Sequence, residues 1–480
     1  MAGVIRGCDG SKKKVKIIKK YFPFFFIFLV VLVIYFPVFS LYFTQDDFFV
    51  LKMGTAKSLS DFFNFFSFHN PHGYAFYRPL TTQVYNFLIK SLFGLQPLYF
   101  HLVSFIFFLA NIILVFKILE KLLKKRSLSF LVAFFYGINA SNLGSLAYIS
   151  NFQEIGMAFF LFLSFWFYLE DKKIAPLFFV FSLLSKENAL VFPLILIVYE
   201  FLLGQRGWKK TLPFWLVLIV YGLLRLGVGL PDVSVYQPVF TPIKIINSYF
   251  WYFLWGIGLP EMLIDFVGPG LKIDPRLIIY YRQEVQIIFS TSLVFVLLLA
   301  GSILRLPKKE KPLEAFFLLW FLLGLLPVIF WPWHKFAYYL TFPLLGLVGF
   351  LVLLLKNLPK ALIGVGVFLL LVVSLTTIHL SWRTYWVITR AKIAENLVND
   401  LKVKYPQLPQ GAILYFENDP EYPLILGFGN SSNQAYYTLS GENGPQVIYD
   451  DYRLKVYYED LEKPPEGEVI FSIIAKIKQK

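Results

Sequence analysis

Long apolar runs separated by short polar segments fill the first 380 residues of the chain. The first run, residues 21–43, contains no charged residue. It is long enough to cross a bilayer, whose hydrocarbon core takes about 20 apolar residues of helix. The repeated pattern predicts a polytopic α-helical membrane protein with about eleven transmembrane helices. These spans are expected at 21–43, 98–120, 127–145, 152–169, 174–185, 187–203, 211–229, 286–304, 313–331, 336–355 and 361–380.

Lysine and arginine predict the orientation of these spans. Residues 1–20 are strongly basic, and basic flanks stay on the cytoplasmic side of a membrane. The run at 21–43 is too long for the core of a signal peptide, so we expect a retained anchor in the cell membrane. The net charge of +15 then falls almost wholly on the cytoplasmic side. Topology therefore accounts for the basic composition, and no nucleic-acid partner is expected.

Three segments outside the spans have patterns of their own. The transmembrane domain, 21–380, has two long outer loops at 44–97 and 230–285, and residues 80–94 of the first predict a helix lying in the membrane interface. Residues 381–480 gain Asp, Glu, Asn, Gly and Pro between short β-prone runs. We expect a small extracytoplasmic α/β domain there, with a helix near 383–404 and strands within 412–416 and 468–474.

Metal and disulfide chemistry receive little support. Cys8 is the only cysteine, which excludes an intramolecular disulfide and a cysteine metal cluster. The spacing of the histidines matches no set of metal ligands, although all of them map to the predicted outer side. The residues indicate no cofactor, and dependence on a divalent cation stays open. The histidines are His69, His72, His101, His334 and His379.

Charged side chains of both signs gather at the predicted outer ends of the spans. Charge in or beside a membrane span is costly, so each such residue is a candidate for function. Their concentration at one surface predicts a site for a charged ligand. The candidates are Asp46, Asp47, Arg78, Glu154, Lys186, Glu187, Arg225, His334 and Lys335.

The tandem acids Asp46 and Asp47 follow the first span directly. A carboxylate at that depth is partly desolvated, which suits a general base, although a solvated helix end would look the same. Arg78 is a candidate phosphate ligand or a lipid-headgroup contact. Glu154 begins a span, where it either orients a substrate or favours the helix N-terminus.

Each of the remaining candidate residues also has more than one interpretation. Lys186 and Glu187 join two apolar runs, where a plain hairpin would use neutral residues. An unpaired Arg225 in a span would be expensive, so a buried partner or a lipid phosphate is expected. His334 and Lys335 lie among aromatic residues and either hold a phosphate or anchor an aromatic belt.

Taken in order, these motifs resemble the GT-C superfamily of integral-membrane glycosyltransferases. The similarity is to protein O-mannosyltransferases, to their relatives with TPR repeats, and to lipid A aminoarabinose transferases, and it covers about residues 20–350. The motifs that carry it are the acids after the first span, Tyr77-Arg-Pro-Leu80, Asn151-Phe-Gln-Glu154, Leu184-Ser-Lys-Glu-Asn-Ala-Leu190 and His334-Lys-Phe-Ala-Tyr-Tyr-Leu340.

The resemblance implies a polyprenyl-phosphate-linked sugar donor and inverting transfer to a protein, lipid or glycan acceptor outside the cytoplasm. It implies Asp46 as the base, with Asp47 second and Glu154 assisting. The donor phosphate would face Arg78, Lys186, Arg225, His334 and Lys335, with Glu187 and Tyr338 in supporting positions. The sequence departs from the family at the acidic pair, which is Asp-Asp where mannosyltransferases more often have Asp-Glu, at 334–335, and in its tail.

Inverting transfer independently requires a base within reach of the acceptor hydroxyl and positive charge beside the leaving phosphate. A transporter or flippase of lipid-linked sugars is the alternative, but it predicts polar groups at the membrane midplane and inverted repeats, which the sequence lacks. A sensor whose tail binds a partner would not need so many spans.

Overall fold

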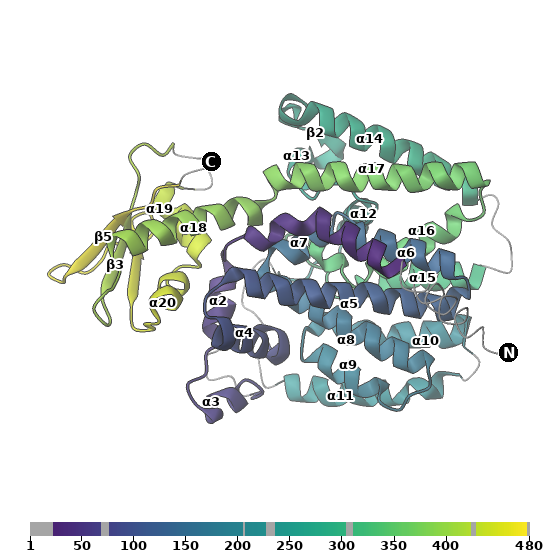
Figure 1. Cartoon of the computed structure of the whole chain (residues 1–480), viewed down its shortest axis with the longest axis horizontal. Coiled ribbons are helices and arrows are strands. Elements are labelled where there is room, and N and C mark those ends of the chain that lie inside the picture. The colour runs from purple at the N-terminus through teal and green to yellow at the C-terminus, as the bar shows by residue number, and fades with distance from the viewer. Residues whose placement is uncertain are drawn as a thin grey trace, which may run out of the picture.

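Apolar residues recur at helical spacing over most of the chain, and the described residues are accordingly mostly helical. The computed structural model describes residues 23–68, 76–204, 207–226, 236–303, 311–423 and 429–477. The basic N-terminal residues 1–20, His69 and His72 lie outside these ranges. The long helices lie side by side and run along the long axis of the molecule (Figure 1).

Five helical segments among the described residues are long and apolar enough to cross a membrane. The structure is thus that of a helical protein with several candidate membrane spans, as the hydrophobic pattern predicts. The five segments are Pro23–Ser40, Pro97–Leu123 (α5), Ile149–Leu169, which contains η3 (Ile149–Asn151) and α8 (Phe152–Leu169), Pro275–Ile303 (α14), and Lys360–Lys404, which contains α17 (Lys360–Thr384) and α18 (Trp386–Lys404).

Shorter helices occupy the other predicted spans. Two of them, α6 (Arg126–Ile138) and α16 (Leu344–Leu355), are strongly apolar. The count of about eleven spans and the GT-C fold stay predictions, because these helices are short for crossing a bilayer alone. The others are α9 (Ala175–Leu183), α10 (Phe192–Leu202), α11 (Leu212–Arg225) and α15 (Lys311–Gly324).

The bundle is held together largely by aromatic packing. Helix α5 contacts α6 and α8, α8 contacts α9, and α15 joins α10 to α16. Trp320 of α15 is fully buried and packs edge-on against Phe165 of α8, with ring centroids 5.0 Å apart. Such pairs add about 0.5–1.5 kcal/mol beyond the area they bury. This contact joins two helices that lie far apart in the sequence.

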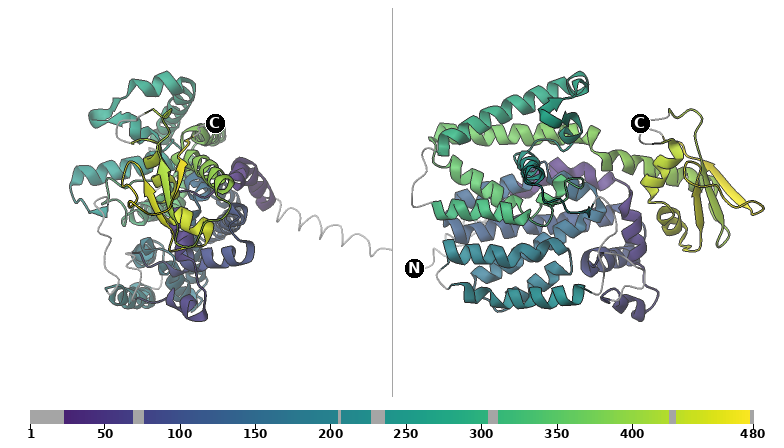
Figure 2. Two further views of the ribbon diagram at one scale, coloured as in Figure 1. Left: turned by 90° about the vertical axis from the view of Figure 1, so that its left-hand side faces the viewer. Right: turned by 180° about the vertical axis from the view of Figure 1, so that it is seen from behind.

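The two ends of the bundle differ in character. One end carries the short elements of the first loop and the C-terminal strands, and Figure 2 shows from behind that these lie at the same end. Helix α5 starts at this end and, at about 1.5 Å per residue, carries the basic residues 121–126 to the other. The first-loop elements are α2 (Asp46–Met53), α3 (Leu59–Asn64), η2 (Pro79–Val84) and α4 (Tyr85–Phe93).

Residues 80–94 are helical as expected, beginning with the π-helical turn η2 and continuing as α4. Residues 236–274 of the second predicted loop form another group of shorter elements, and the long helix α14 already begins at Pro275. The remaining elements are η1 (Phe36–Ser40), α7 (Asn142–Ala147), η4 (Glu187–Val191), η5 (Trp208–Thr211), α12 (Pro242–Gly256), α13 (Leu263–Phe266), β1 (Val267–Gly268), η7 (Pro269–Leu271), β2 (Lys272–Ile273) and η9 (Ala337–Leu340).

The C-terminal part contains the expected helix, α18, and a parallel three-stranded sheet in the order β4-β3-β5. Leu414 of the central strand is fully buried and lies opposite Val456 and Phe471 of its neighbours. The strand β4 was not expected from the sequence. The start of this domain at residue 381 and its location outside the cytoplasm stay predictions. The elements are β3 (Ile413–Glu417), α19 (Ser431–Leu439), α20 (Asn443–Tyr449), β4 (Lys455–Tyr458) and β5 (Ile470–Ile474).

Candidate functional site

A cavity of about 890 Å³ lies where α2, the start of α8 and the 186–188 and 327–339 segments meet. We call it the Asp46 cavity. It brings together side chains from segments nearly 300 residues apart in the chain. Seven of the sequence-predicted residues line it: Asp46, Arg78, Lys186, Glu187, Arg225, His334 and Tyr338.

Asp46 is placed by a tight turn at the start of α2. The backbone N–H of Asp47 donates to the carbonyl of Thr44 at 3.0 Å, and the backbone N–H of Asp46 donates to the Tyr148 hydroxyl at 3.0 Å. The Asp46 side chain is solvent-accessible at the cavity wall, yet protein surrounds it closely. The surrounding protein displaces water from the carboxylate and so raises the pKa of Asp46, while the Tyr148 hydroxyl and the charges of Arg390 and Arg78 oppose the rise. Such a carboxylate suits proton transfer.

Asp47 turns away from the cavity and is 1% exposed. Its Oδ2 accepts from the Thr44 N–H at 3.0 Å, and its Oδ1 accepts from the Ser150 N–H at 2.7 Å and the Ser150 hydroxyl at 2.8 Å. Burial raises the pKa of Asp47 to about 7, although these hydrogen bonds oppose the rise. Asp47 thus ties the turn to η3, and only Asp46 is exposed to the cavity.

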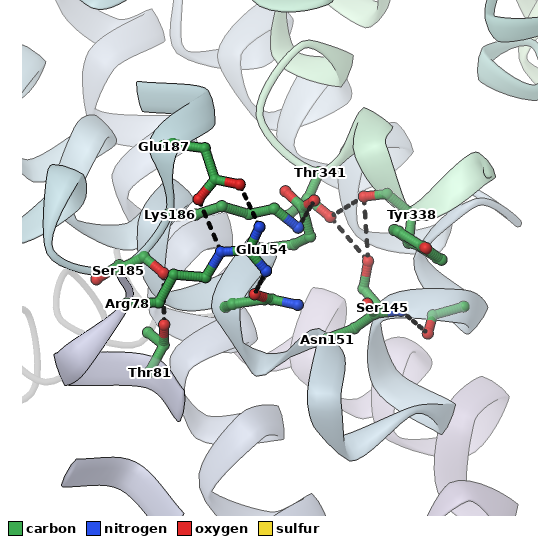
Figure 3. A network of polar contacts seen from close by, with 12 residues as sticks. Arg78, Thr81, Ser145, Asn151, Glu154, Ser185, Lys186, Glu187, Tyr338 and Thr341 are labelled. Carbon is green, nitrogen blue, oxygen red and sulfur yellow. Dashed lines mark hydrogen bonds and ion pairs between the residues drawn. The ribbon is translucent and has the colours of Figure 1, made fainter. Parts of the chain in front are cut away.

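Arg78 forms a bidentate ion pair with Glu187 and donates a further hydrogen bond to Gln153 (Figure 3). The chain brings them together because the Thr81 hydroxyl donates to the Ser185 carbonyl at 2.6 Å. Pro79 also keeps the preceding Arg78 out of a helical conformation. The predicted phosphate ligand therefore already has a carboxylate partner.

Lys186 and Glu154 form a second ion pair, with Nζ and Oε1 2.7 Å apart and the two side chains 4% and 0% exposed. The backbone of Lys186 is extended, with φ −162° and ψ +140°, and Glu187 begins the 3₁₀ helix η4 directly after it, so the two side chains leave the chain in different directions (Figure 3). Lys186 can thus contact Glu154 while Glu187 contacts Arg78, as Figure 3 shows. Glu154 is fully buried and does not line the cavity, and its carboxylate contacts Lys186.

A glycine allows these two pairs to lie close together. A Cβ atom on Gly156 of α8 would lie only 2.8 Å from Cγ2 of Thr81. Any larger residue would push η2, which begins directly after Arg78, away from the helix that carries Glu154.

His334 and Lys335 face different cavities. His334 lines the Asp46 cavity beside Tyr236, with ring centroids 4.6 Å apart, and burial lowers its pKa to about 4. It is therefore a neutral hydrogen-bonding group at pH 7. Lys335 lines a separate cavity of about 830 Å³, where its Nζ donates to Asn247 Oδ1 at 2.8 Å. The structure does not bring Lys335 to Asp46.

Several residues of the site were not anticipated. Tyr148, Gln153, Tyr236 and Tyr339 line the Asp46 cavity, and Arg390 of α18 adds positive charge near Asp46. Tyr148 and Tyr236 gave no signal, because Tyr is common throughout the chain, whereas Tyr339 lies within the motif at 334–340. Gln153 adjoins Glu154 in a motif that the sequence already singled out.

The histidines do not form a metal site among the described residues. His101 is buried, and its two ring nitrogens lie 3.1 and 3.2 Å from the carbonyls of Leu146 and Leu41, which makes it a structural link. In the described ranges no group of three His, Cys, Asp or Glu side chains is placed to hold a metal ion.

Comparison with known proteins adds no family. No model of a known protein family matches the sequence, and no curated protein is significantly similar to it. The likeness to GT-C glycosyltransferases therefore stays a prediction from short motifs.

Proposed function

We propose that the protein transfers a sugar from a polyprenyl-phosphate donor to an acceptor hydroxyl or amine in the Asp46 cavity, with inversion at the anomeric carbon. Support comes from the meeting of an acid, several cations and a row of aromatic rings in one cavity at the end of apolar helices. Such an arrangement suits a ligand with a prenyl chain in the membrane and a sugar phosphate at its surface.

Asp46 acts as the general base. Its carboxylate takes the proton of the acceptor group while the acceptor oxygen or nitrogen attacks the anomeric carbon. The bond between that carbon and the phosphate oxygen breaks, and the lipid phosphate leaves with the electron pair. A positioned base of this kind contributes typically 10²–10⁴-fold to the rate.

The cations stabilise the leaving phosphate. Arg78 and Lys186 are held at fixed positions by Glu187 and Glu154, so they need not reorganise as charge develops. Arg225 lines the same cavity, and neutral His334 adds a hydrogen-bonding group.

One observation carries the proposal: Asp46, Arg78, Lys186 and Arg225, from four segments of the chain, line a single cavity. The test uses purified protein in lipid nanodiscs, given polyprenyl-phosphate sugars with a labelled sugar and candidate acceptors. We expect label to reach an acceptor with the wild-type protein. Asp46→Asn, which keeps the shape of the side chain, should reduce this transfer by about 10²–10⁴-fold.

A matched control is Asp450→Asn. Asp450 is exposed and has φ +50°, a conformation that Asn tolerates well, and it does not line the cavity. The control should retain wild-type transfer. Equal transfer by the Asp46 variant and the control would overturn the proposal. In proteoliposomes, which separate the two leaflets, movement of intact labelled lipid across the bilayer with no transfer would favour a flippase.

A further inference from the structure

The backbone of Gln45 adopts a conformation that is unusual for a residue with a side chain. Its φ is +50° and its ψ is −121°. Together with the hydrogen bond from Asp47 N–H to Thr44 O, these angles match the first central position of a type II′ turn, which Gly usually occupies. A non-Gly residue there costs about 1–3 kcal/mol and persists only when neighbouring contacts hold it.

Those contacts come from the C-terminal part of the chain. The backbone N–H of Gln45 donates to the carbonyl of Thr438 in α19 at 2.7 Å. The Gln45 side chain accepts from the Arg390 guanidinium of α18 through its Oε1, also at 2.7 Å. Both partners lie more than 340 residues further along the chain, so the turn before Asp46 depends on the tail.

The same part of the chain also contacts the other end of α2. Lys52 Nζ lies 3.3 Å from Glu442 Oε1, and the Thr55 hydroxyl lies 2.8 Å from the Tyr452 hydroxyl. Helix α20 packs against α2, and Figure 1 shows the two close together. The tail therefore contacts the element that carries Asp46 at its start and at its end.

Arg390 also acts on Asp46 through its charge. Its guanidinium is one of the groups that oppose the rise in the pKa of Asp46 caused by burial. Loss of this charge would raise the pKa of Asp46 further, because an opposite charge nearby favours the ionised carboxylate.

We propose that the C-terminal part clamps α2 in place through Gln45, and that Arg390 is a positioning residue for the Asp46 carboxylate. This inference rests on the proposed function, in which Asp46 is the base. The tail is then part of the transfer machinery, although none of its described residues lines the cavity. The C-terminal part holds the strained turn at Gln45 and helps to keep the Asp46 carboxylate ionised.

The test compares Arg390→Met with Arg390→Lys and with the control Lys392→Met. Lys392 is an exposed cation two residues along the same helix, on another face. Arg390→Met should lower kcat about tenfold with little change in KM, and should move the acid limb of the pH–rate profile to higher pH. Arg390→Lys should restore the position of that limb, and Lys392→Met should match the wild type.

Hydrogen exchange supplies a readout that needs no transfer activity. Amides of residues 44–53 should exchange faster in Arg390→Met than in Lys392→Met, since the clamp holds the start of α2. The inference is overturned when Arg390→Met keeps the wild-type pH profile and the wild-type exchange while Asp46→Asn is inactive. Full activity of Asp46→Asn would instead overturn the proposed function, and the exchange measurement would still decide whether the clamp exists.

Discussion

Asp46 and Asp47 are adjacent in the chain, but Asp46 lines the cavity whereas Asp47 is 1% exposed and accepts three hydrogen bonds. The first residue of a helix and the second differ by about 100° in direction, so a tight turn can send one carboxylate to the site and the other into the protein. The two residues therefore differ in role: Asp47 holds the turn in place, and Asp46 projects from that turn into the cavity.

Asp47→Asn should therefore lower stability. An asparagine keeps only one acceptor oxygen, and its amide nitrogen accepts no hydrogen bond, so either the Thr44 or the Ser150 backbone N–H loses its partner; leaving a buried donor unpaired costs about 1–3 kcal/mol. Thermal unfolding in detergent at about pH 3.5 checks this, because burial raises the pKa of Asp47 in the folded protein and the carboxyl is then mostly protonated in both the folded and the unfolded state, so the change of charge matters little. Asp46→Asn should unfold at close to the wild-type temperature; equal losses in both variants would contradict the division of roles.

The rate of transfer should fall as the pH is lowered. The midpoint of this fall should lie at a higher pH than an ordinary aspartate base would give. The base must be ionised, and burial raises the pKa of Asp46 above its usual value of 3.8. The rate therefore rises with pH through this raised pKa and levels off above it. A pH–rate profile of kcat/KM measures the position of the limb. A limb at or below pH 3.8 would contradict the assignment of a desolvated base.

The Glu154–Lys186 pair should behave as a buried unit. Replacing one partner leaves an uncompensated charge, which costs roughly 3–5 kcal/mol. Glu154→Leu and Lys186→Met should each destabilise the protein by this amount, and the double variant by much less than their sum. Thermal unfolding of the four proteins completes the cycle. Additive losses would show that the two side chains do not interact.

Gln45 should tolerate glycine better than alanine. Glycine adopts positive φ without steric cost, whereas a Cβ does not, so Gln45→Gly should be more stable than Gln45→Ala by about 1 kcal/mol. Both variants lose the hydrogen bond to Arg390, and their difference therefore reports the backbone alone. Unfolding temperatures in detergent measure it, and an advantage for alanine would contradict the strained turn.

Donor binding should distinguish the two cavities. Arg225 lines the Asp46 cavity and Lys335 lines the other. A hydrogen bond to a charged group contributes about 1.5–3 kcal/mol, so Arg225→Gln should raise the KM for the lipid-linked donor roughly 10- to 100-fold. Lys335→Gln should leave this KM within twofold of the wild type. The reverse pattern would place the donor phosphate beside Lys335.

The hydrophobic pattern alone predicted a mostly helical chain with several helices long and apolar enough to cross a membrane, and it predicted the helix and two strands of the tail. It did so because the length and periodicity of apolar runs are local properties of the chain. Charge at the ends of those runs also singled out the five charged residues that line the cavity, since charge beside a membrane span is costly; they are Asp46, Arg78, Lys186, Glu187 and Arg225.

Tertiary structure decided which of these residues meet. Asp47 and Glu154 are carboxylates at the ends of apolar runs, where the sequence also predicts a general base. Packing buries them instead as partners of Ser150 and Lys186. His334 and Lys335 separate because consecutive side chains point in different directions. Arg390 reaches Gln45 across 345 residues, and no local pattern records such a contact, because only the folded bundle brings α18 beside α2.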